Sequence, residues 1–212
     1  MINIRKKKDL EIVIESIPNY VNPKEELEQY ITPSNIVANI LWDAYLRGDI
    51  EGKRVIDLGC GTGRFAIGAV LLGALTSICI DVDNEALNIA FSVSKKIGVN
   101  TIMHFILADV RGYNPIRRLH DCTVVMNPPF GIHSRGADID FLKTALSICD
   151  TVYSIHKLSE GFIKLIDKLS SEMRFTYEII SEYNFPIRWF LPKHRRRVYY
   201  VKTVIIRFRR SM

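Results

Sequence analysis

The sequence predicts an α/β protein built on an open, mostly parallel β-sheet. The first observation behind this prediction is a short apolar run, residues 55–58, that leads into three alternate glycines and then into an apolar helical segment. This order of strand, glycine turn and helix starts a dinucleotide-type fold. Further strand-like runs alternate with helix-like segments up to residue 169, as repeated β-α units do. Two long alternating strands near the C-terminus should close the sheet as an antiparallel pair.

Composition fits one domain with a sizeable core. The chain has 212 residues, of which 48% are hydrophobic and 25% charged. We expect an N-terminal arm at residues 1–26 and a single domain at residues 27–212. The net charge of +6 comes from the C-terminal end, because residues 183–212 hold nine of the 29 Lys and Arg residues and no acid.

The cysteines and the N-terminus indicate where the protein works. Four widely spaced cysteines with no CxxC pair argue against a zinc site and against a disulfide framework, and they suit a reducing compartment; they are Cys60, Cys79, Cys122 and Cys149. The basic residues 5–8 are followed by acids rather than an apolar block, so they do not form a signal peptide. No apolar run approaches membrane-spanning length. We therefore expect a cytoplasmic protein without a membrane contact.

The first elements are set by prolines and glycines. Residues 4–16 are compatible with a short helix or a strand. Thr32 followed by Pro33 predicts a helix start, with the threonine as N-cap and the proline at the first helical position. Apolar residues then recur at helical spacing up to Gly48, a typical C-terminal stop.

The glycine turn has the spacing G-x-G-x-G, not the G-x-G-x-x-G of NAD-binding enzymes, so it does not match their pyrophosphate cradle. The next strand, residues 76–80, ends in Asp81, which lies 22 residues beyond Gly59, where a carboxylate can bind a ribose diol. Asp83 should cap the following helix, which ends at Gly98. The strand at residues 101–107 is followed by Asp109.

Residues 123–126 form an apolar run that stops at Asn127, Pro128, Pro129 and Phe130. The prolines lack N–H groups, so this backbone offers carbonyl acceptors beside an amide oxygen and a flat ring. That combination suits an amino group on a planar ring, with Asn127 Oδ1 and the Pro128 carbonyl accepting its two hydrogens and Phe130 stacking on the ring. A Pro-Pro turn with Phe130 buried in the core is the simpler alternative. Because strand ends of a parallel sheet share one edge, Asn127 should lie near Asp81 and Asp109, although each aspartate alone is as readily a helix cap.

These motifs resemble those of class I methyltransferases, which use S-adenosylmethionine and methylate planar nitrogens. The wider pattern adds residues 27–30, 141–146, 152–157 and the C-terminal basic cluster. It is similar to the methyltransferase-like protein five family and its archaeal relatives, which methylate adenine N6 in small-subunit ribosomal RNA. The resemblance covers about residues 27–208 and implies a Rossmann-like seven-stranded methyltransferase sheet, mostly parallel with an antiparallel C-terminal strand pair. It is weakest at residues 131–136 and in the C-terminal strands.

The resemblance also implies roles for individual residues. The catalytic group would be Asn127, Pro128, Pro129 and Phe130. Within the cofactor site, Gln29 and Thr32 would line the entrance, Asp81 would bind the ribose hydroxyls, and Asp109 with Val110 would hold the adenine. The full set of expected cofactor residues is Gln29, Tyr30, Thr32, Asp57, Gly59, Cys60, Gly61, Thr62, Gly63, Arg64, Asp81, Val82, Asp109 and Val110.

The remaining segments suggest a lid, an RNA contact and a partner. Residues 131–136 form a polar, glycine-bounded loop after the site, and Asp138 should cap the helix that follows. The loop between the last two strands mixes aromatic residues with cations, which is typical of phosphate contacts; its expected RNA-binding residues are Lys193, His194, Arg195, Arg196 and Arg197. The apolar strand at residues 101–107 should be a sheet edge, where the resemblance implies pairing with a small zinc-ribbon adaptor protein.

Three alternatives to RNA methylation remain open. The Asn-Pro-Pro-aromatic signature also serves DNA adenine-N6 and protein glutamine-N5 methylation, because an amide nitrogen is planar too. DNA enzymes usually carry a separate target-recognition domain, for which this chain is short, and glutamine modifiers do not need the cationic loop. A catalytically silent RNA-binding module is the non-enzyme alternative, against which the intact Gly59, Asp81, Asp109 and Asn127 argue.

Overall fold

The computed structural model describes residues 2–111, 116–131, 133–188 and 198–211. Its helices are α1 (Lys7–Glu15), α2 (Ser34–Leu46), α3 (Arg64–Leu71), α4 (Asn84–Ile97), α5 (Ala137–Ile148) and α6 (Glu160–Met173). Its strands are β1 (Arg54–Leu58), β2 (Thr76–Asp81), β3 (Met103–Leu107), β4 (Cys122–Met126), β5 (Thr151–Lys157), β6 (Phe175–Arg188) and β7 (Val198–Arg210). Short 3-10 turns lie at Glu25–Leu27 and Asn100–Ile102.

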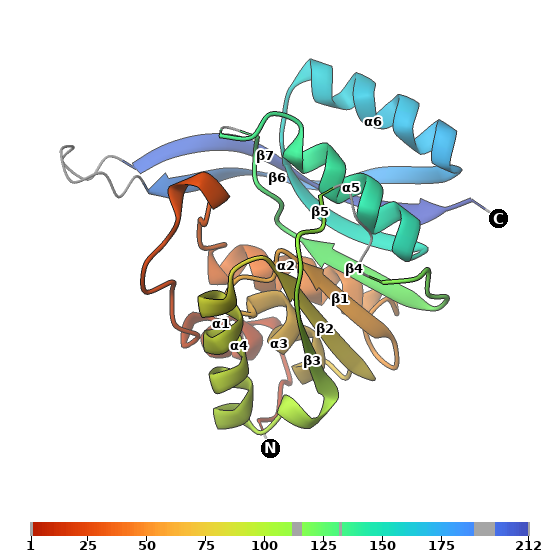
Figure 1. Ribbon diagram of the computed structural model, residues 1–212. Coiled ribbons are helices and arrows are strands. Elements are labelled where there is room, and N and C mark those ends of the chain that lie inside the picture. The colour runs from red at the N-terminus through yellow and green to blue at the C-terminus, as the bar shows by residue number, and fades with distance from the viewer. Residues whose placement is uncertain (1, 112–115, 132, 189–197, 212) are drawn as a thin grey trace.

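All seven strands form one sheet in the order β3-β2-β1-β4-β5-β7-β6. The strands from β3 to β5 are parallel, while β7 pairs antiparallel with both β5 and β6. The predicted fold class is therefore confirmed, including the antiparallel C-terminal pair. β6 and β7 extend together as a long ribbon beyond the rest of the sheet (Figure 1).

The register of the parallel strands brings the expected site residues together. Leu58 at the end of β1 lies opposite Ile80 on one side and Met126 on the other. The residues that follow these three are Gly59, Asp81 and Asn127. The glycine turn, the ribose-type carboxylate and the carboxamide thus leave the sheet side by side, at the carboxyl edge where such sheets bind ligands.

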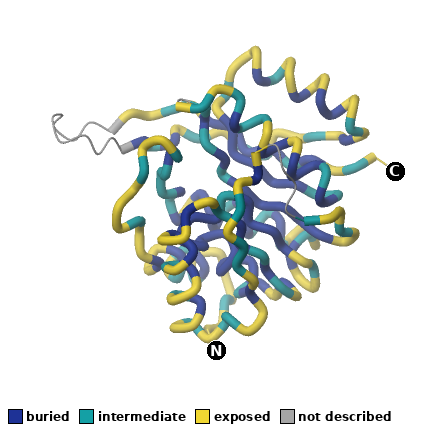
Figure 2. The backbone as a smooth tube through the Cα atoms, viewed as in Figure 1, coloured by how far each residue is buried: buried dark blue, intermediate teal, exposed yellow. Residues whose placement is uncertain are grey.

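Helices cover both faces of the sheet, which is why its central strands are continuously apolar. Along β4, Val124 belongs to the core shared with α5 and α6, whereas Val125 belongs to the core shared with α1 and α2. All five residues of β4 are buried, and the buried positions follow the central strands in Figure 2. A strand buried on both faces is held firmly, so Asn127 starts from a well-fixed position.

The N-terminal segment packs against the body of the protein. Residues 7–15 are helical, which decides between the helix and the strand that the sequence allowed. Leu10 and Ile14 are fully buried in the same core as Leu41 of α2. This packing carries the chain after α1 across the carboxyl edge of the sheet, toward the glycine turn.

Two expected helix caps are wrong and one is confirmed. α2 begins at Ser34, with Pro33 in the cap position and no side-chain cap bond, because the Thr32 hydroxyl accepts a hydrogen bond from Asn127 instead. α5 begins at Ala137 after Gly136, whose φ of 85° favours glycine, so Asp138 lies in the first turn rather than at the cap. Asp83 does cap α4, accepting from the Glu85 backbone N–H at 3.0 Å.

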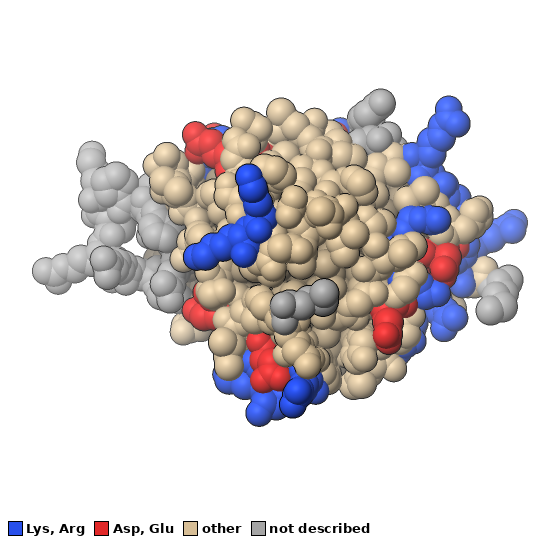
Figure 3. All heavy atoms as spheres, turned by 90° about the horizontal axis from the view of Figure 1, so that it is seen from below, with Lys and Arg blue, Asp and Glu red and all other residues tan. Residues whose placement is uncertain are grey.

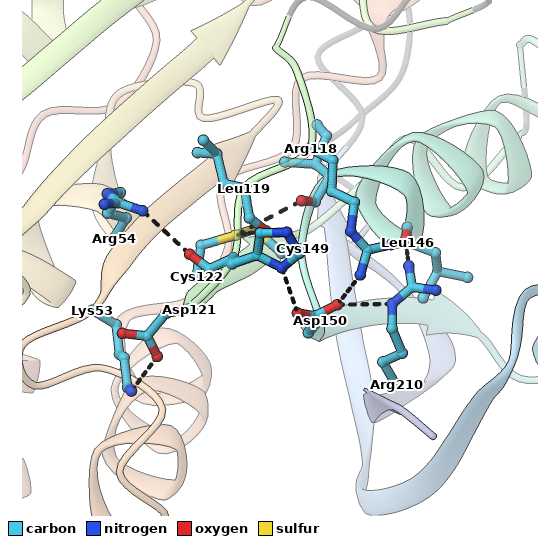
Figure 4. Close-up of polar contacts among 12 residues, drawn as sticks. Lys53, Arg54, Arg118, Leu119, Asp121, Cys122, Leu146, Cys149, Asp150 and Arg210 are labelled. Atoms are coloured by element: carbon cyan, nitrogen blue, oxygen red, sulfur yellow. Dashed lines mark hydrogen bonds and ion pairs between the residues drawn. A yellow bond between two sulfur atoms is a disulfide. The ribbon is translucent and has the colours of Figure 1, made fainter. Parts of the chain in front are cut away.

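The expectation that the cysteines form no disulfide is also wrong. Cys122 at the start of β4 is bonded to Cys149 at the end of α5, with their Cα atoms 5.4 Å apart, whereas Cys60 and Cys79 are free and buried. Sequence spacing could not reveal this pair, because the fold brings together residues 27 positions apart. Figure 4 shows the surrounding ion pairs, in which Asp150 accepts from both Arg118 and Arg210.

The basic excess is partly paired. Seen from below, basic side chains gather at the end of the molecule where the C-terminus lies, with acidic side chains among them (Figure 3). On β7, Arg207 contacts Asp49 at 2.9 Å and Arg210 contacts Asp150 at 2.7 Å.

No helix in the described part of the chain is long and apolar enough to cross a membrane.

Candidate active site

The glycine turn is suspended from the neighbouring strand. The backbone N–H groups of Gly59 and Cys60 donate to the Ile80 carbonyl at 2.8 and 3.1 Å. Gly61 has a φ of 52°, and a Cβ placed on it would lie 2.1 Å from the Tyr20 hydroxyl. The missing side chain therefore lets Tyr20, from the N-terminal segment, lie directly over the turn. Sequence reasoning gave Tyr20 no role, since nothing local indicates that it returns to this loop.

Three expected cofactor residues shape the turn but are not among the residues that line the cavity. Asp57 is fully buried, and its Oδ2 accepts the Ala66 backbone N–H at 2.9 Å, which fixes the start of α3. Burial raises the pKa of Asp57 to about 8, and the nearby charge of Asp81 adds to this shift. Gly63 allows α3 to approach α4, because a Cβ there would lie 2.9 Å from the Ala90 Cβ. Gly61 is the third, for the reason given above.

The other expected cofactor residues share one cavity. Its lining includes Gln29, Tyr30, Thr32, Gly59, Cys60, Thr62, Arg64, Asp81, Val82, Asp109 and Val110, together with Asn127 and Pro129. Thr62 contributes a buried hydroxyl that has no hydrogen-bond partner among the described residues. Tyr20, Glu28, Arg111 and Phe141 also line this cavity and were not expected.

Asp81 is held in place by the turn itself. Its Oδ2 accepts the Gly61 N–H at 2.8 Å and its Oδ1 accepts the Asp83 N–H at 2.9 Å. Desolvation raises the pKa of Asp81, while these backbone bonds oppose the shift. The Asp81 carboxylate is therefore fixed relative to the glycine turn, because the Gly61 backbone sets its orientation.

Asp109 is occupied by a neighbour that the sequence did not suggest. Arg111 donates to both carboxylate oxygens, with Nη2 2.7 Å from Oδ2 and Nε 3.0 Å from Oδ1. This bidentate pair lowers the pKa of Asp109. Val110 is 2% exposed, so it forms an apolar wall between the strand end and α5.

Arg64 tethers the N-terminal segment over the site. Its guanidinium donates to the Thr32 and Ile17 carbonyls at 3.0 and 3.1 Å and to Asn19 Oδ1 at 3.1 Å. Burial lowers the pKa of Arg64. Nearby, the Tyr30 hydroxyl is buried with no hydrogen-bond partner among the described residues, and desolvation raises its pKa to about 12.

Asn127 lines the same cavity as the glycine turn and has a defined orientation. Its Nδ2 donates to the Thr32 hydroxyl at 2.9 Å. Its Oδ1 is buried and has no hydrogen-bond partner among the described residues. A buried acceptor without a partner is costly, and such groups concentrate where a ligand completes the bonding. The amide is therefore anchored by its donor end while its acceptor end remains available.

The rest of the Asn-Pro-Pro-Phe motif divides between the cavity and the core. Pro129 lines the cavity, whereas Pro128 is buried. Phe130 is 8% exposed and packs edge-on against Phe185, with ring centroids 5.4 Å apart. Phe130 thus lies in the core, as in the simpler alternative, and is not among the residues that line the cavity.

Some of the expected residues lie outside the part of the chain that the structure describes. The RNA-binding residues Lys193, His194, Arg195, Arg196 and Arg197 lie outside the described residues. In the loop at residues 131–136, Ile132 also lies outside them. The edge position of the third strand is confirmed, although β3 starts at Met103, after a 3-10 turn, and not at Thr101.

A family model described as ribosomal protein L11 methyltransferase (PrmA) matches residues 41–124. This match covers the glycine turn and Asp81 but ends three residues before Asn127, so it concerns the cofactor half of the domain. An uncharacterised protein from Methanocaldococcus jannaschii is 36% identical, covering 95% of this chain and 93% of that protein.

Two further matches span the whole domain. The zebrafish (Danio rerio) rRNA N(6)-adenosine-methyltransferase METTL5 is 32% identical, covering 96% of this chain and 98% of that protein. The crystal structure of a candidate RNA methyltransferase from Pyrococcus horikoshii matches with a TM-score of 0.87 and 37% identity, covering 99% of this chain and all of that one. The sequence similarity, the seven-stranded sheet and the cavity lined by the glycine turn, Asp81 and Asn127 all agree: the chain belongs to the METTL5 family of S-adenosylmethionine-dependent methyltransferases.

Proposed function

We propose that this protein transfers a methyl group from S-adenosyl-L-methionine to N6 of an adenosine in small-subunit ribosomal RNA. The observation that carries the proposal is the Asn127 carboxamide, which lines the same cavity as the glycine turn and whose buried Oδ1 has no hydrogen-bond partner among the described residues. An exocyclic amine has the N–H donors that such an acceptor needs. The full-length similarity to METTL5 proteins, whose zebrafish member is named an rRNA N(6)-adenosine-methyltransferase, supports adenosine as the target.

The residues of the cavity fit the cofactor. Gly59 lines the cavity with a φ of 69°, and a Cβ there would meet the Phe141 ring at 3.0 Å, so this position of the turn favours glycine. In the proposed arrangement Asp81 binds the ribose hydroxyls, and Asp109 and Val110 hold the adenine. Gly59, Thr62 and Arg64 border the methionine part, and Gln29 and Thr32 line the entrance. Arg111 engages both oxygens of Asp109 through its side chain, and its backbone N–H donates to Oδ1 at 2.9 Å, so hydrogen bonds from the cofactor to this carboxylate would have to share acceptors with Arg111.

The chemical task of the chain is to position a weak nucleophile. The cofactor supplies an activated methyl group on a sulfonium. The amine of adenine is unreactive because its lone pair is delocalised into the ring. Hydrogen bonds to Asn127 Oδ1 and the Pro128 carbonyl would favour a pyramidal nitrogen and direct its lone pair at the methyl carbon. No general base is needed before transfer, because the neutral amine attacks with its lone pair and releases its extra proton to solvent only after the N–C bond has formed and the C–S bond has broken.

Contact with the target ring needs an additional step. Adenine N6 is inaccessible in a duplex, so the base must be unpaired or flipped before it enters the site. Stacking by Phe130 remains a prediction, and it requires the ring to leave its contact with Phe185. Pro129 already lines the cavity and offers an apolar surface to the base without rearrangement.

The basic residues near the C-terminal end favour RNA over the alternative substrates. Residues 188–197 contain five Lys or Arg residues and no acid. The strands that flank this segment in the sequence, β6 and β7, extend beyond the rest of the sheet (Figure 1). We propose Lys193, His194, Arg195, Arg196 and Arg197 as phosphate contacts. The PrmA match does not favour a protein substrate, because it ends before Asn127. A ribosomal RNA substrate is also consistent with the expected cytoplasmic location.

We also propose a small zinc-ribbon adaptor on the β3 edge. β3 pairs only with β2 among the described strands, so its outer edge has free backbone groups. Around it, Leu107, Phe91 and Ile102 are 59%, 45% and 39% exposed, an apolar surface suited to burial. Co-expression with such a protein should raise the soluble yield; an isolated chain that is fully soluble and active would contradict this requirement.

The function is tested by identifying the product. The protein is incubated with small-subunit ribosomal RNA and methyl-labelled S-adenosylmethionine, and the nucleosides are separated by mass spectrometry. We expect the label in N6-methyladenosine. Label in another nucleoside, or in glutamine of added ribosomal proteins, would replace the proposed substrate, and no label in any of them would contradict the enzymatic function.

A further inference from the structure

Glu28 is a buried acid that the proposed chemistry does not use. It is 6% exposed and lines the cavity. Its Oε2 accepts the backbone N–H of Phe130 at 2.7 Å, and its Oε1 accepts that of His133 at 2.8 Å. One carboxylate thus binds two backbone groups about a hundred residues away in the sequence, at the start of the loop that follows the catalytic motif.

The place of these two bonds follows from the chemistry of the motif. Pro128 and Pro129 have no N–H group, so the backbone beside Asn127 cannot be held by acceptors until Phe130. Phe130 is therefore the first residue after Asn127 whose backbone can donate, and Glu28 accepts that bond. Because both oxygens of a buried carboxylate are engaged by donors, the contact is strong and has a defined direction.

The segment that carries Glu28 also contacts the cofactor side of the cavity. Next to it, the Gln29 side chain donates to Asp83 Oδ2 at 2.6 Å and accepts from the Lys24 N–H at 2.7 Å. Three residues further on, Thr32 accepts from Asn127. Residues 24–32 thus form a strap that joins the loop after Asp81 to the catalytic motif.

The backbone of the strap indicates that the position of Glu28 is imposed. Glu28 has a φ of 50° and a ψ of 46°, a left-handed conformation that costs free energy for any residue with a Cβ. Such conformations persist where surrounding contacts determine them, and they concentrate at functional sites. Here the contacts include the two side-chain bonds to the catalytic loop and two backbone bonds within the strap, from Glu28 to the Glu25 carbonyl and from Tyr30 to the Glu28 carbonyl.

We propose that Glu28 is a positioning residue for methyl transfer: its carboxylate fixes Phe130 and His133, and thereby sets the position of the Asn127 and Pro128 acceptors relative to the cofactor. This proposal rests on the proposed function for its activity measurement, but not for its structural one. The strap then does more than cover the cavity: the turnover number depends on the hydrogen bonds from Phe130 and His133 to Glu28, while the affinity for the cofactor does not.

Three variants separate this role from a general structural one. Glu28→Gln keeps the size of the side chain but replaces one acceptor with a donor, so one of the two backbone N–H groups loses its bond. Glu28→Asp keeps the charge but is too short to hold both groups. Glu172→Gln makes the same chemical change on the exposed surface of α6 and serves as the matched control.

The measurements are amide hydrogen exchange, calorimetric binding of S-adenosylhomocysteine, and the turnover number on RNA. For Glu28→Gln we expect faster exchange at residues 130 and 133, a dissociation constant within about threefold of the wild type, and turnover reduced about 10-fold to 100-fold, as expected for a lost charge-assisted hydrogen bond. Glu28→Asp should be intermediate and Glu172→Gln unchanged.

Two results would overturn the proposal. Wild-type exchange and turnover in Glu28→Gln would show that the contact does not position the motif. An equal loss of cofactor affinity and turnover would show that Glu28 only maintains the fold. If the wild-type protein methylates no adenosine, the proposed function fails, and the exchange and binding measurements still decide whether Glu28 holds the loop independently of the cofactor.

Discussion

Replacing Asn127 with alanine should separate catalysis from stability. In the structure the side chain makes one hydrogen bond, from Nδ2 to Thr32, while Oδ1 has no partner among the described residues. Truncation should therefore destabilise the fold by only about 1 kcal/mol, the net value of one hydrogen bond. In the transition state the loss is larger, because a preorganised acceptor for the reacting amine disappears. The loss of one such bond costs about 3–4 kcal/mol, or at least about 100-fold in turnover.

The assay compares turnover on ribosomal RNA with the free energy of unfolding in urea. Asn127→Asp keeps an acceptor in the same place and should recover part of the lost activity. Asn88→Ala, on the exposed face of α4, is the control for the same truncation. Full activity in Asn127→Ala would refute the role of the carboxamide, and a loss of stability as large as the loss of activity would assign it to folding instead.

Three further predictions concern groups around the site. Thr32→Val removes the acceptor that orients Asn127, so turnover should fall about tenfold or more as the amide loses its fixed orientation, without a change in RNA affinity measured by filter binding. His156 is fully buried beside Ser154 and Asp138, and desolvation lowers its pKa. Because the unfolded state then binds a proton that the folded state does not, the free energy of unfolding should fall as the pH drops below about 6.5. Urea unfolding should show a smaller fall between pH 7 and pH 5 for His156→Gln than for the wild type. The Cys122–Cys149 disulfide closes a loop of sequence separation 27, so its reduction should lower the free energy of unfolding in urea by about 3 kcal/mol. The reductant should have no effect on the stability of the Cys122→Ala/Cys149→Ala protein.

The sequence was informative wherever local chemistry determines the structure. Alternate glycines after an apolar strand predicted the turn that Gly59 and Gly61 form, and two prolines after a buried strand predicted the extended end at Asn127. Since parallel strands end at one edge, the convergence of Asp81 and Asn127 followed from the fold class. Full-length similarity to METTL5 then agreed with these local signals.

The errors and omissions involve contacts between distant segments. Thr32 has the local pattern of a helix cap, but Asn127, 95 residues away, engages its hydroxyl. Glu28 contacts Phe130 across 102 residues, and Tyr20 reaches Gly61 from a segment with no motif of its own. Phe130 packs against Phe185, a contact that the local pattern around Asn127 did not indicate. Such pairings depend on tertiary packing, which local patterns do not contain.

The central claim is that Asn127 and Pro128 hold the amine of an adenine at the cofactor. The most direct measurement is a crystal structure of the protein with S-adenosylhomocysteine and a short RNA that contains the target adenosine. We expect N6 of that adenosine within about 3 Å of both Asn127 Oδ1 and the Pro128 carbonyl oxygen. An adenine bound elsewhere, or a carboxamide whose Oδ1 is still without a partner in that complex, would contradict the account.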